Sequence, residues 1–263
     1  MIRSGCGVWS NRQWVGRIFA PNTPADGYLR QYATTFSAVE GNTSFYGLPL
    51  PERVHKWKKS VPESFRFCFK VPREITHIKR LVDAETELSQ FLERMAPLSD
   101  NLGPFFLQFP RSFGPLYADI LYAFISHLPL EFAFAVELRH PDFLGSAEYA
   151  KRIVDREVSM VITDTRPHVA KNPQSPERTP SYMGKNPIIR YIGLEDIKKN
   201  APFLSQWASV CEHWLSVGCS PYFFAHTDTD EHAPEIARGL HLLCPSSPPA
   251  PCWISEGGQL ELF

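Results

Sequence analysis

Several charged and amide side chains lie inside short apolar runs, where they could bind an anion or transfer protons. Lys70, Gln108, Glu137 and Arg190 are each flanked by phenylalanine, valine or isoleucine. A buried charge is costly unless it is paired or lines a cavity. The pattern therefore favours a functional site over a purely structural ion network, which is the alternative.

The residue types divide into anion-binding groups and proton-transfer groups. Lys70, Arg139 and Arg190 are predicted to clamp a phosphate or carboxylate, because ammonium and guanidinium groups match those oxygens. Glu137 is the first candidate for an acid or base with a tuned pKa, Glu40 the second, and Asp164 completes the predicted catalytic set. The other predicted substrate-binding residues are Asn42, Tyr46, His77, Gln108, His140 and Trp9.

A divalent metal is an alternative at one place in the chain. The stretch from His226 to His232 holds two histidines and three carboxylates, with His226 and Asp228 as the candidate ligands. Such groups suit zinc, manganese or magnesium. However, the sequence lacks HExxH and other zinc spacings, so we predict no cofactor as the first choice.

Eight short apolar runs read as buried strands that would bring these residues together. The runs are Ile2–Trp9, Phe36–Glu40, Phe65–Val71, Pro104–Phe109, Phe132–Glu137, Val158–Thr163, Ile188–Ile192 and Pro221–Ala225. Helical patterns fill most gaps, including a short basic helix over Pro51–Ser60. Eight strand–helix alternations predict a (β/α)8 TIM-like barrel over residues 1–244, with its site at the carboxyl ends of the strands.

Two segments depart from this alternation. Residues 165–186 carry proline, asparagine and serine in place of a helical pattern, which is typical of a lid or binding loop. Residues 245–263 begin with a proline-rich stretch and are predicted to be a flexible tail.

Composition fits a globular chain and excludes several classes. The 263 residues are 43% hydrophobic and 21% charged, with no apolar run long enough to span a membrane and no secretory signal at the start. Six cysteines without metal-ligand spacing indicate free thiols and a cytoplasmic location. The sequence contains no GxSxG, Walker A or GxGxxG motif, which disfavours triad hydrolases, P-loop NTPases and dinucleotide enzymes.

The net charge of −1 hides an uneven distribution. Residues 1–80 hold 13 lysines and arginines against 5 acidic residues, and acidic residues predominate in the remainder. This asymmetry indicates an anionic partner such as nucleic acid, with Trp9, Trp14, Tyr46 and Trp57 available for stacking. The alternative is that the two signs pair with each other in the folded protein.

The strand-end motifs together resemble the YecE-like family, also called domain of unknown function 72. The resemblance covers about residues 1–243 and is carried by Gly5–Trp9, Glu40–Tyr46, Lys70–His77, Gly103–Pro110, Glu137–Phe143 and Asp164-Thr165. It implies a TIM-like barrel, and it implies no reaction. The chain departs from some members after the last strand, where His226-Thr227 replaces Asn-Asn, and after Arg190, where Ile192-Gly193 replaces His-Gly.

The end of the chain resembles the short peptide by which bacterial proteins dock on the sliding clamp. Gln259 would supply amide hydrogen bonds, and Leu260, Leu262 and Phe263 would be apolar anchors. The third position departs from that peptide, because Glu261 stands where serine or aspartate is usual. A tail that folds back onto the main domain is the alternative.

These observations favour an enzyme that uses acid–base or hydrolytic chemistry on a phosphate- or carboxylate-bearing small molecule. One rival is a DNA-linked phosphodiesterase or DNA-binding accessory recruited by the clamp. Another is a sugar or sugar-phosphate isomerase or lyase, and a third is a non-catalytic adaptor. A non-specific DNA partner would be recognised by salt-dependent binding through residues 1–80.

Overall fold

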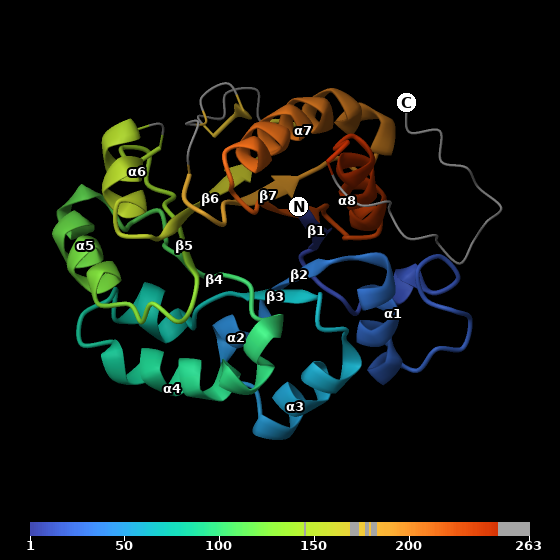
Figure 1. Cartoon of the computed structure of the whole chain (residues 1–263), viewed down its shortest axis with the longest axis horizontal. Coiled ribbons are helices and arrows are strands. Elements are labelled where there is room, and N and C mark those ends of the chain that lie inside the picture. Colours follow the sequence, from blue (N-terminus) through green and yellow to red (C-terminus); the bar gives the residue numbers. More distant parts are fainter. Residues whose placement is uncertain (145, 169–173, 177–178, 180–182, 247–263) are drawn as a thin grey trace.

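The chain folds into parallel strands surrounded by helices, and we describe it from a computed structural model (Figure 1). The structure describes residues 1–144, 146–168, 174–176, 179 and 183–246. The predicted clamp-docking peptide and most of the predicted tail lie outside these ranges. Within them, no helix combines the length and the apolar character needed to cross a membrane.

All eight predicted strands are present. They are β1 (Arg3–Cys6), β2 (Ala38–Gly41), β3 (Arg66–Phe69), β4 (Phe105–Gln108), β5 (Phe134–Glu137), β6 (Ser159–Asp164), β7 (Ile188–Ile192) and β8 (Tyr222–His226). Their phenylalanine, valine and isoleucine side chains suit strands that are buried on both faces.

The helices lie on the outside of the strands, as Figure 1 shows. They are α1 (Tyr28–Thr35), α2 (Thr43–Tyr46), α3 (Pro51–Ser60), α4 (Glu85–Met95), α5 (Ala118–Ser126), α6 (Ala147–Val154), α7 (Ala201–Ser216) and α8 (Ala233–Leu242). The predicted basic helix α3 is confirmed. It begins with a proline, whose missing N–H would have no partner inside the helix at that position. It ends with lysines, whose positive charge interacts favourably with the negative end of the helix dipole.

The prediction of a closed (β/α)8 barrel is wrong. The strands form a parallel six-stranded sheet in the order β1-β8-β7-β6-β5-β4 and a separate two-stranded sheet of β2 and β3. The chain is therefore an α/β protein with a mostly parallel sheet and without a closed hydrogen-bonded barrel.

Side chains occupy the gap between β1 and β2, which explains why the ladder is interrupted there. The Tyr32 hydroxyl accepts from the Cys6 backbone N–H at 2.7 Å and donates to the Ala38 carbonyl at 3.0 Å. The Ser37 hydroxyl likewise accepts from the Ser4 N–H at 3.1 Å. These hydroxyls take the hydrogen bonds that a direct backbone ladder would use.

At the other gap, β3 and β4 meet through isolated bridges rather than a continuous ladder. Gly103 N–H donates to the Phe67 carbonyl at 2.8 Å, and Val71 N–H donates to the Phe106 carbonyl at 3.0 Å. Pro104 stands between these two contacts on its side and has no N–H to donate. The strands predicted from the sequence are thus confirmed, but the hydrogen-bonded ladder does not run continuously from one strand to the next.

The core has two parts. The larger part fills the space between the strands and the helices, and a smaller one joins side chains from the inner strand faces. The smaller cluster consists of Ala38, Cys68, Phe106, Ala135, Val161, Ile188, Tyr222 and Phe224. It draws residues from both sheets, so the two sheets enclose a common apolar interior.

Candidate functional site

A layer of polar side chains lies directly after the inner apolar cluster along the strands. Successive side chains of a strand alternate between its two faces, so residues two apart share a face. Seven members of the inner cluster are each followed, two positions later in the sequence, by a polar residue. These polar residues are Glu40, Lys70, Gln108, Glu137, Thr163, Arg190 and His226. We call these seven residues the strand-end cluster.

Glu40 and Arg190 form the centre of the cluster. Arg190 Nε donates to Glu40 Oε2 at 2.8 Å and its Nη2 donates to Oε1 at 3.0 Å, which is a bidentate pair. Asn42 Nδ2 donates to Glu40 Oε1 at 2.9 Å, and His226 Nε2 lies 3.2 Å from Oε2. The Glu40 carboxylate is fully buried, so these partners replace its water.

The pKa values of this pair follow from burial and mutual attraction. Burial by itself would raise the pKa of Glu40, but Arg190 and then His226 outweigh burial and hold that pKa well below its ordinary value. Burial likewise opposes the charge of Arg190, yet Glu40 and Glu137 raise the pKa of Arg190 above its ordinary value. Both groups are therefore charged across the physiological range.

Glu137 connects four neighbours. Its Oε2 accepts from Gln108 Nε2 at 2.7 Å and from Arg190 Nη1 at 3.3 Å. Its Oε1 accepts from Thr163 Oγ1 at 2.9 Å and lies 3.5 Å from Arg139 Nε. Because both oxygens have two partners and the side chain is fully buried, Glu137 holds the surrounding groups in place.

Lys70 occupies an unusual position in this cluster. Its Nζ donates to Gln108 Oε1 at 2.6 Å and lies 3.5 Å from the centre of the Phe45 ring. Among the residues that the structure describes, no carboxylate forms an ion pair with it. Burial, followed by the nearby charge of Arg190, lowers the pKa of Lys70 to about 8.

Three more predicted substrate-binding residues contact either Glu40 or Phe45. Asn42 contacts Glu40, as described above, and Tyr46 projects from α2 with 84% of its surface exposed. The His77 ring contacts Phe45 at 5.0 Å between centres, and its Nδ1 lies 2.9 Å from Thr76 Oγ1. Burial, and then the charges of Lys70 and Arg73, lower the pKa of His77 to about 4.

The structure separates Asp164 from the strand-end cluster. Asp164 accepts from Trp207 Nε1 at 2.7 Å and pairs with Arg166 at 2.8 Å, so it faces α7 on the opposite side of β6. Thr163, one position earlier, reaches Glu137. Alternation along the strand would have selected Thr163, and the sequence analysis missed both this residue and Phe45.

Trp9 and His140 are also placed elsewhere. Trp9 packs edge-on against Trp57, with ring centres 5.4 Å apart, and lies partly buried against the hydrophobic core. His140 follows Arg139 but contacts Asp142 and sits against Gly114, where a Cβ would come within 2.9 Å of its ring. Within the described ranges, neither residue forms a hydrogen bond, ion pair or ring contact with a member of the strand-end cluster.

The two candidate metal ligands have different surroundings. His226 faces Glu40, and its ring lies so close to the Gly7 backbone that a Cβ there would be 2.3 Å from the ring. Asp228 is exposed. In the part of the chain that the structure describes, no group of three or more histidine, cysteine or acidic residues is arranged to hold a metal ion.

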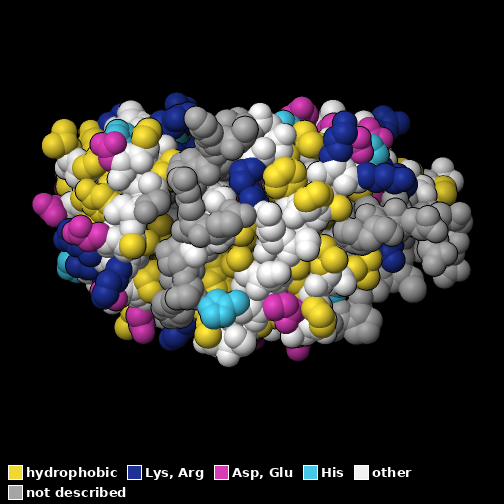
Figure 2. All heavy atoms as spheres, turned by 90° about the horizontal axis from the view of Figure 1, so that it is seen from above, with side chains coloured by type: hydrophobic (Ala, Val, Ile, Leu, Met, Phe, Trp, Pro, Cys, Tyr) yellow, Lys and Arg dark blue, Asp and Glu magenta, His cyan; other side chains and the backbone are white. Residues whose placement is uncertain are grey.

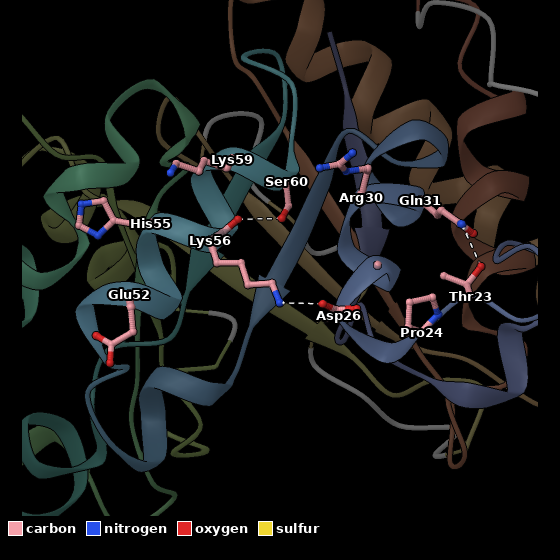
Figure 3. Close-up of a pocket in the computed structure, with 11 residues that line it drawn as sticks. Thr23, Pro24, Asp26, Arg30, Gln31, Glu52, His55, Lys56, Lys59 and Ser60 are labelled. Atoms are coloured by element: carbon pink, nitrogen blue, oxygen red, sulfur yellow. Dashed lines mark hydrogen bonds and ion pairs between the residues drawn. The ribbon is translucent and has the colours of Figure 1, made fainter.

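A separate open cleft lies between α1 and α3, with a volume of about 940 Å³ (Figure 3). Lys56 reaches across it to Asp26 at 3.1 Å. Arg30 and Lys59 also line the cleft and form no hydrogen bond or ion pair with any residue that the structure describes. These cations belong to the basic segment over residues 1–80.

The aromatic rings predicted to stack on nucleic-acid bases are mostly buried. Trp14 is fully buried and Trp57 is 6% exposed, so neither presents a ring face to a ligand. Tyr46 is exposed but stands on α2, beside Phe45. The basic segment therefore offers cations without the predicted row of stacking rings.

Parallel strands with outer helices and a buried ion network at their carboxyl ends define an α/β protein with a polar strand-end site. Residues 3–251 match the family described as "Protein of unknown function DUF72", and the chain belongs to this family. The resemblance seen in the sequence motifs is thereby confirmed.

The relatives agree with that assignment. The chain is 35% identical over 256 residues to the UPF0759 protein YecE of Escherichia coli K12, covering 91% of each protein, and equally similar to the O157:H7 protein. A DUF72 structure from Enterococcus faecalis superimposes with a TM-score of 0.74 at 24% identity, over 96% of this chain and 98% of that one. One from Thermotoga maritima has a TM-score of 0.68 at 19% identity, over 91% and 96%. These two structures support the fold alone.

Proposed function

We propose that this DUF72 protein is an enzyme that binds a small phosphate- or carboxylate-bearing substrate over the strand-end cluster and transforms it by acid–base chemistry. The observation that carries the proposal is Lys70, a largely buried amine with a pKa of about 8 and no carboxylate partner in the described ranges. A group whose pKa lies near the working pH can both accept and release a proton.

The remaining residues divide between anchoring the substrate and holding Lys70. Arg139 keeps 45% of its side chain exposed and approaches Glu137 through Nε, and its two terminal nitrogens make no hydrogen bond within the described ranges. Guanidinium groups of this kind suit a bidentate anion contact. If Glu137 or Glu40 acted directly as an acid or base, as expected from the sequence, it would have to give up existing hydrogen bonds. We therefore assign both carboxylates the role of positioning the neighbouring side chains.

Isothermal titration with inorganic phosphate, citrate and sugar phosphates tests the anion site. Replacing Arg139→Gln should weaken the binding of a recognised anion about tenfold, which corresponds to about 1.4 kcal/mol. The control is Arg53→Gln, an exposed arginine on α3, which should bind normally. Equal affinity of both variants and the wild type would reject the strand-end anion site.

The other candidate roles differ in what they bind. A sugar-phosphate isomerase or lyase uses the same cluster and differs by saturation with free sugars or sugar phosphates. A DNA-linked role is favoured by the cations of the α1–α3 cleft and would show salt-dependent oligonucleotide binding. An adaptor role predicts that variants of Lys70 and Arg139 leave the cellular function intact.

Docking on the sliding clamp stays a proposal that the tail sequence supports. Deleting residues 259–263 should abolish binding to purified clamp, because Leu260, Leu262 and Phe263 are the proposed anchors. Equal binding before and after the deletion would end the idea. A cytoplasmic location is proposed on the cysteines: Cys6, Cys68, Cys211, Cys219 and Cys244 are all free and buried.

A further inference from the structure

Lys70 is held differently from the ion-paired lysines of this protein. Lys56, Lys79 and Lys151 each pair with a carboxylate, at 3.1, 2.7 and 2.6 Å. Lys70 keeps 8% of its surface exposed and contacts an amide oxygen and an aromatic ring instead. Neither partner carries a full negative charge, so this environment favours the neutral amine more than the surface pairs do.

The amide partner is fixed in one orientation. Gln108 Nε2 donates to the Glu137 carboxylate at 2.7 Å, which accepts and cannot donate, so Gln108 Oε1 must face Lys70. A neutral amine gives one hydrogen to that oxygen and keeps a lone pair. The backbone is also held, because Ser44 Oγ donates to the Lys70 carbonyl at 2.7 Å.

We infer that Lys70 is a covalent nucleophile, whose amine forms a Schiff base with a small aldehyde or ketone that carries a phosphate or carboxylate. This inference rests on the proposed function, since it uses the same anion site, and it specifies the substrate class. A neutral lysine in a desolvated site beside other cations is the state in which Lys attacks carbonyl carbons. Arg190 and Arg139 supply those cations here.

The step balances without an oxidant or reductant. The nitrogen lone pair forms a bond to the carbonyl carbon while the carbonyl π pair moves to oxygen, and a proton then passes from the nitrogen to that oxygen, which gives a neutral carbinolamine. The freed nitrogen lone pair forms a double bond to carbon as the C–O bond breaks, and the hydroxyl takes one proton from solvent and leaves as water. Glu137 and Glu40, both of which favour a positive charge on Lys70, stabilise the resulting iminium ion.

Reductive trapping tests this inference on the full-length protein. The protein is incubated with dihydroxyacetone phosphate, glyceraldehyde 3-phosphate or pyruvate, each with sodium cyanoborohydride, and the adducts are located by peptide mass spectrometry. With at least one of these probes, we expect Lys70 to be modified at least tenfold faster than Lys59, which is exposed and unpaired among the described residues. Modification of Lys70 no faster than that of Lys59 with every probe would overturn the inference.

Two variants and two further measurements separate a failure of the Schiff base from a failure of the anion site. Lys70→Arg should lose the specific adduct, whereas Lys59→Arg should retain it. Competitive acetylation of the unmodified protein with acetic anhydride across pH 6–11 reports the reactivity of Lys70 without any variant. Titration with inorganic phosphate, citrate and sugar phosphates tests the anion site alone. If one of these anions binds through Arg139 and Lys70 is not trapped, the Schiff base is rejected and the proposed function stands; if none of them binds through Arg139, the proposed function itself fails.

Discussion

At the scale of single residues, the pair of Glu40 and Arg190 contributes most directly to holding the site together. Both side chains are withdrawn from water, and each supplies the charge that the other needs. Removing one partner of such a pair leaves an uncompensated buried charge, which costs more than the pair itself gains. Glu40 therefore acts on the site through the position and charge of Arg190.

Glu40→Gln should lower the free energy of unfolding at pH 7 by about 3–5 kcal/mol, the range for a broken buried ion pair. Urea denaturation measures the change, and Glu52→Gln is the control, because Glu52 is exposed and without a partner among the described residues. That control should stay within about 0.5 kcal/mol of the wild type. A loss below about 1 kcal/mol in Glu40→Gln would contradict a tightly coupled pair.

The same pair predicts a pH dependence with a definite sign. The pKa of Glu40 is lower in the folded protein than in the unfolded chain, so its stabilising contribution is fully present above about pH 4.3. That contribution declines as the pH falls towards the low pKa of the folded state. The stability gap between wild type and Glu40→Gln should therefore narrow below about pH 4. A gap that is constant from pH 7 to pH 3 would contradict the shift.

Lys70 predicts a second pH dependence, on the alkaline side. Its pKa is about 8 in the folded state against an ordinary value of 10.5, so between these values the unfolded chain binds more protons and stability rises with pH. Lys70→Met removes this term. Urea unfolding from pH 7 to 10.5 should show Lys70→Met most favoured relative to wild type at pH 7, with that difference shrinking as the pH rises. A difference independent of pH would show that Lys70 titrates normally.

At the scale of elements, the junction of β1 and β2 depends on a side chain from α1. The Tyr32 hydroxyl satisfies one backbone group on each strand, and Gly5 permits their close approach, since a Cβ there would lie 1.9 Å from the Ala38 carbonyl. Tyr32 thus couples a helix to two strands that form no ladder with each other.

Tyr32→Phe should destabilise the fold by about 1–3 kcal/mol, because it leaves the Cys6 N–H and the Ala38 carbonyl buried without their partner. Thermal and urea unfolding measure the loss. Tyr46→Phe removes the same atom from a ring that is 84% exposed and should change stability by less than about 0.5 kcal/mol. Similar effects of the two substitutions would show that the Tyr32 bridge contributes little.

The sequence predicted the elements better than their closure. Short apolar runs located all eight strands, since burial on both faces selects the same side chains along each strand. The ends of those runs supplied Glu40, Lys70, Gln108, Glu137 and Arg190, which do meet in the structure. Closure depends on long-range hydrogen bonds such as that of Tyr32, and periodicity contains no signal for a hydroxyl that replaces a backbone partner.

Asp164 is a predicted site residue that the alternation of faces along its strand would have excluded. It ends a strand, like the others, but its position places it one residue out of phase with Val161 of the inner cluster. Thr163 is in phase and contacts Glu137. Alternation of faces along β6 was available from the sequence, whereas the Trp207 contact that accommodates Asp164 required the structure.

At the scale of the whole molecule, the charge asymmetry is only partly cancelled by folding. Arg17, from the basic segment, pairs with Glu231 and Glu235 near the end of the described chain. Lys79 pairs with Glu87, just beyond the basic segment, whereas Lys56 pairs with Asp26 inside it. On the face shown in Figure 2, basic and acidic side chains are intermixed.

Cations without acidic partners therefore indicate an anion-binding surface better than the net charge does. Among the described residues, the α1–α3 cleft holds two such cations. Arg30 and Lys59 line this cleft from facing helices (Figure 3). If the protein binds nucleic acid through its basic segment, these two cleft side chains can contact phosphates without first breaking an ion pair or hydrogen bond to any described residue. Each contact of that kind releases a counterion and makes the affinity depend on salt.

Replacing Arg30→Gln and Lys59→Gln together should reduce the slope of log affinity against log salt by about two, with a uniform loss across oligonucleotide sequences. Fluorescence anisotropy with a labelled single strand, from 50 to 300 mM salt, measures it. The matched control is Lys151→Gln, whose lysine lies on α6 and pairs with Asp155 at 2.6 Å. If the double variant and the control share one salt slope, or if the wild type binds no oligonucleotide, the cleft is not a phosphate-tracking surface. The strand-end cluster would then be left as the place where this protein meets anions.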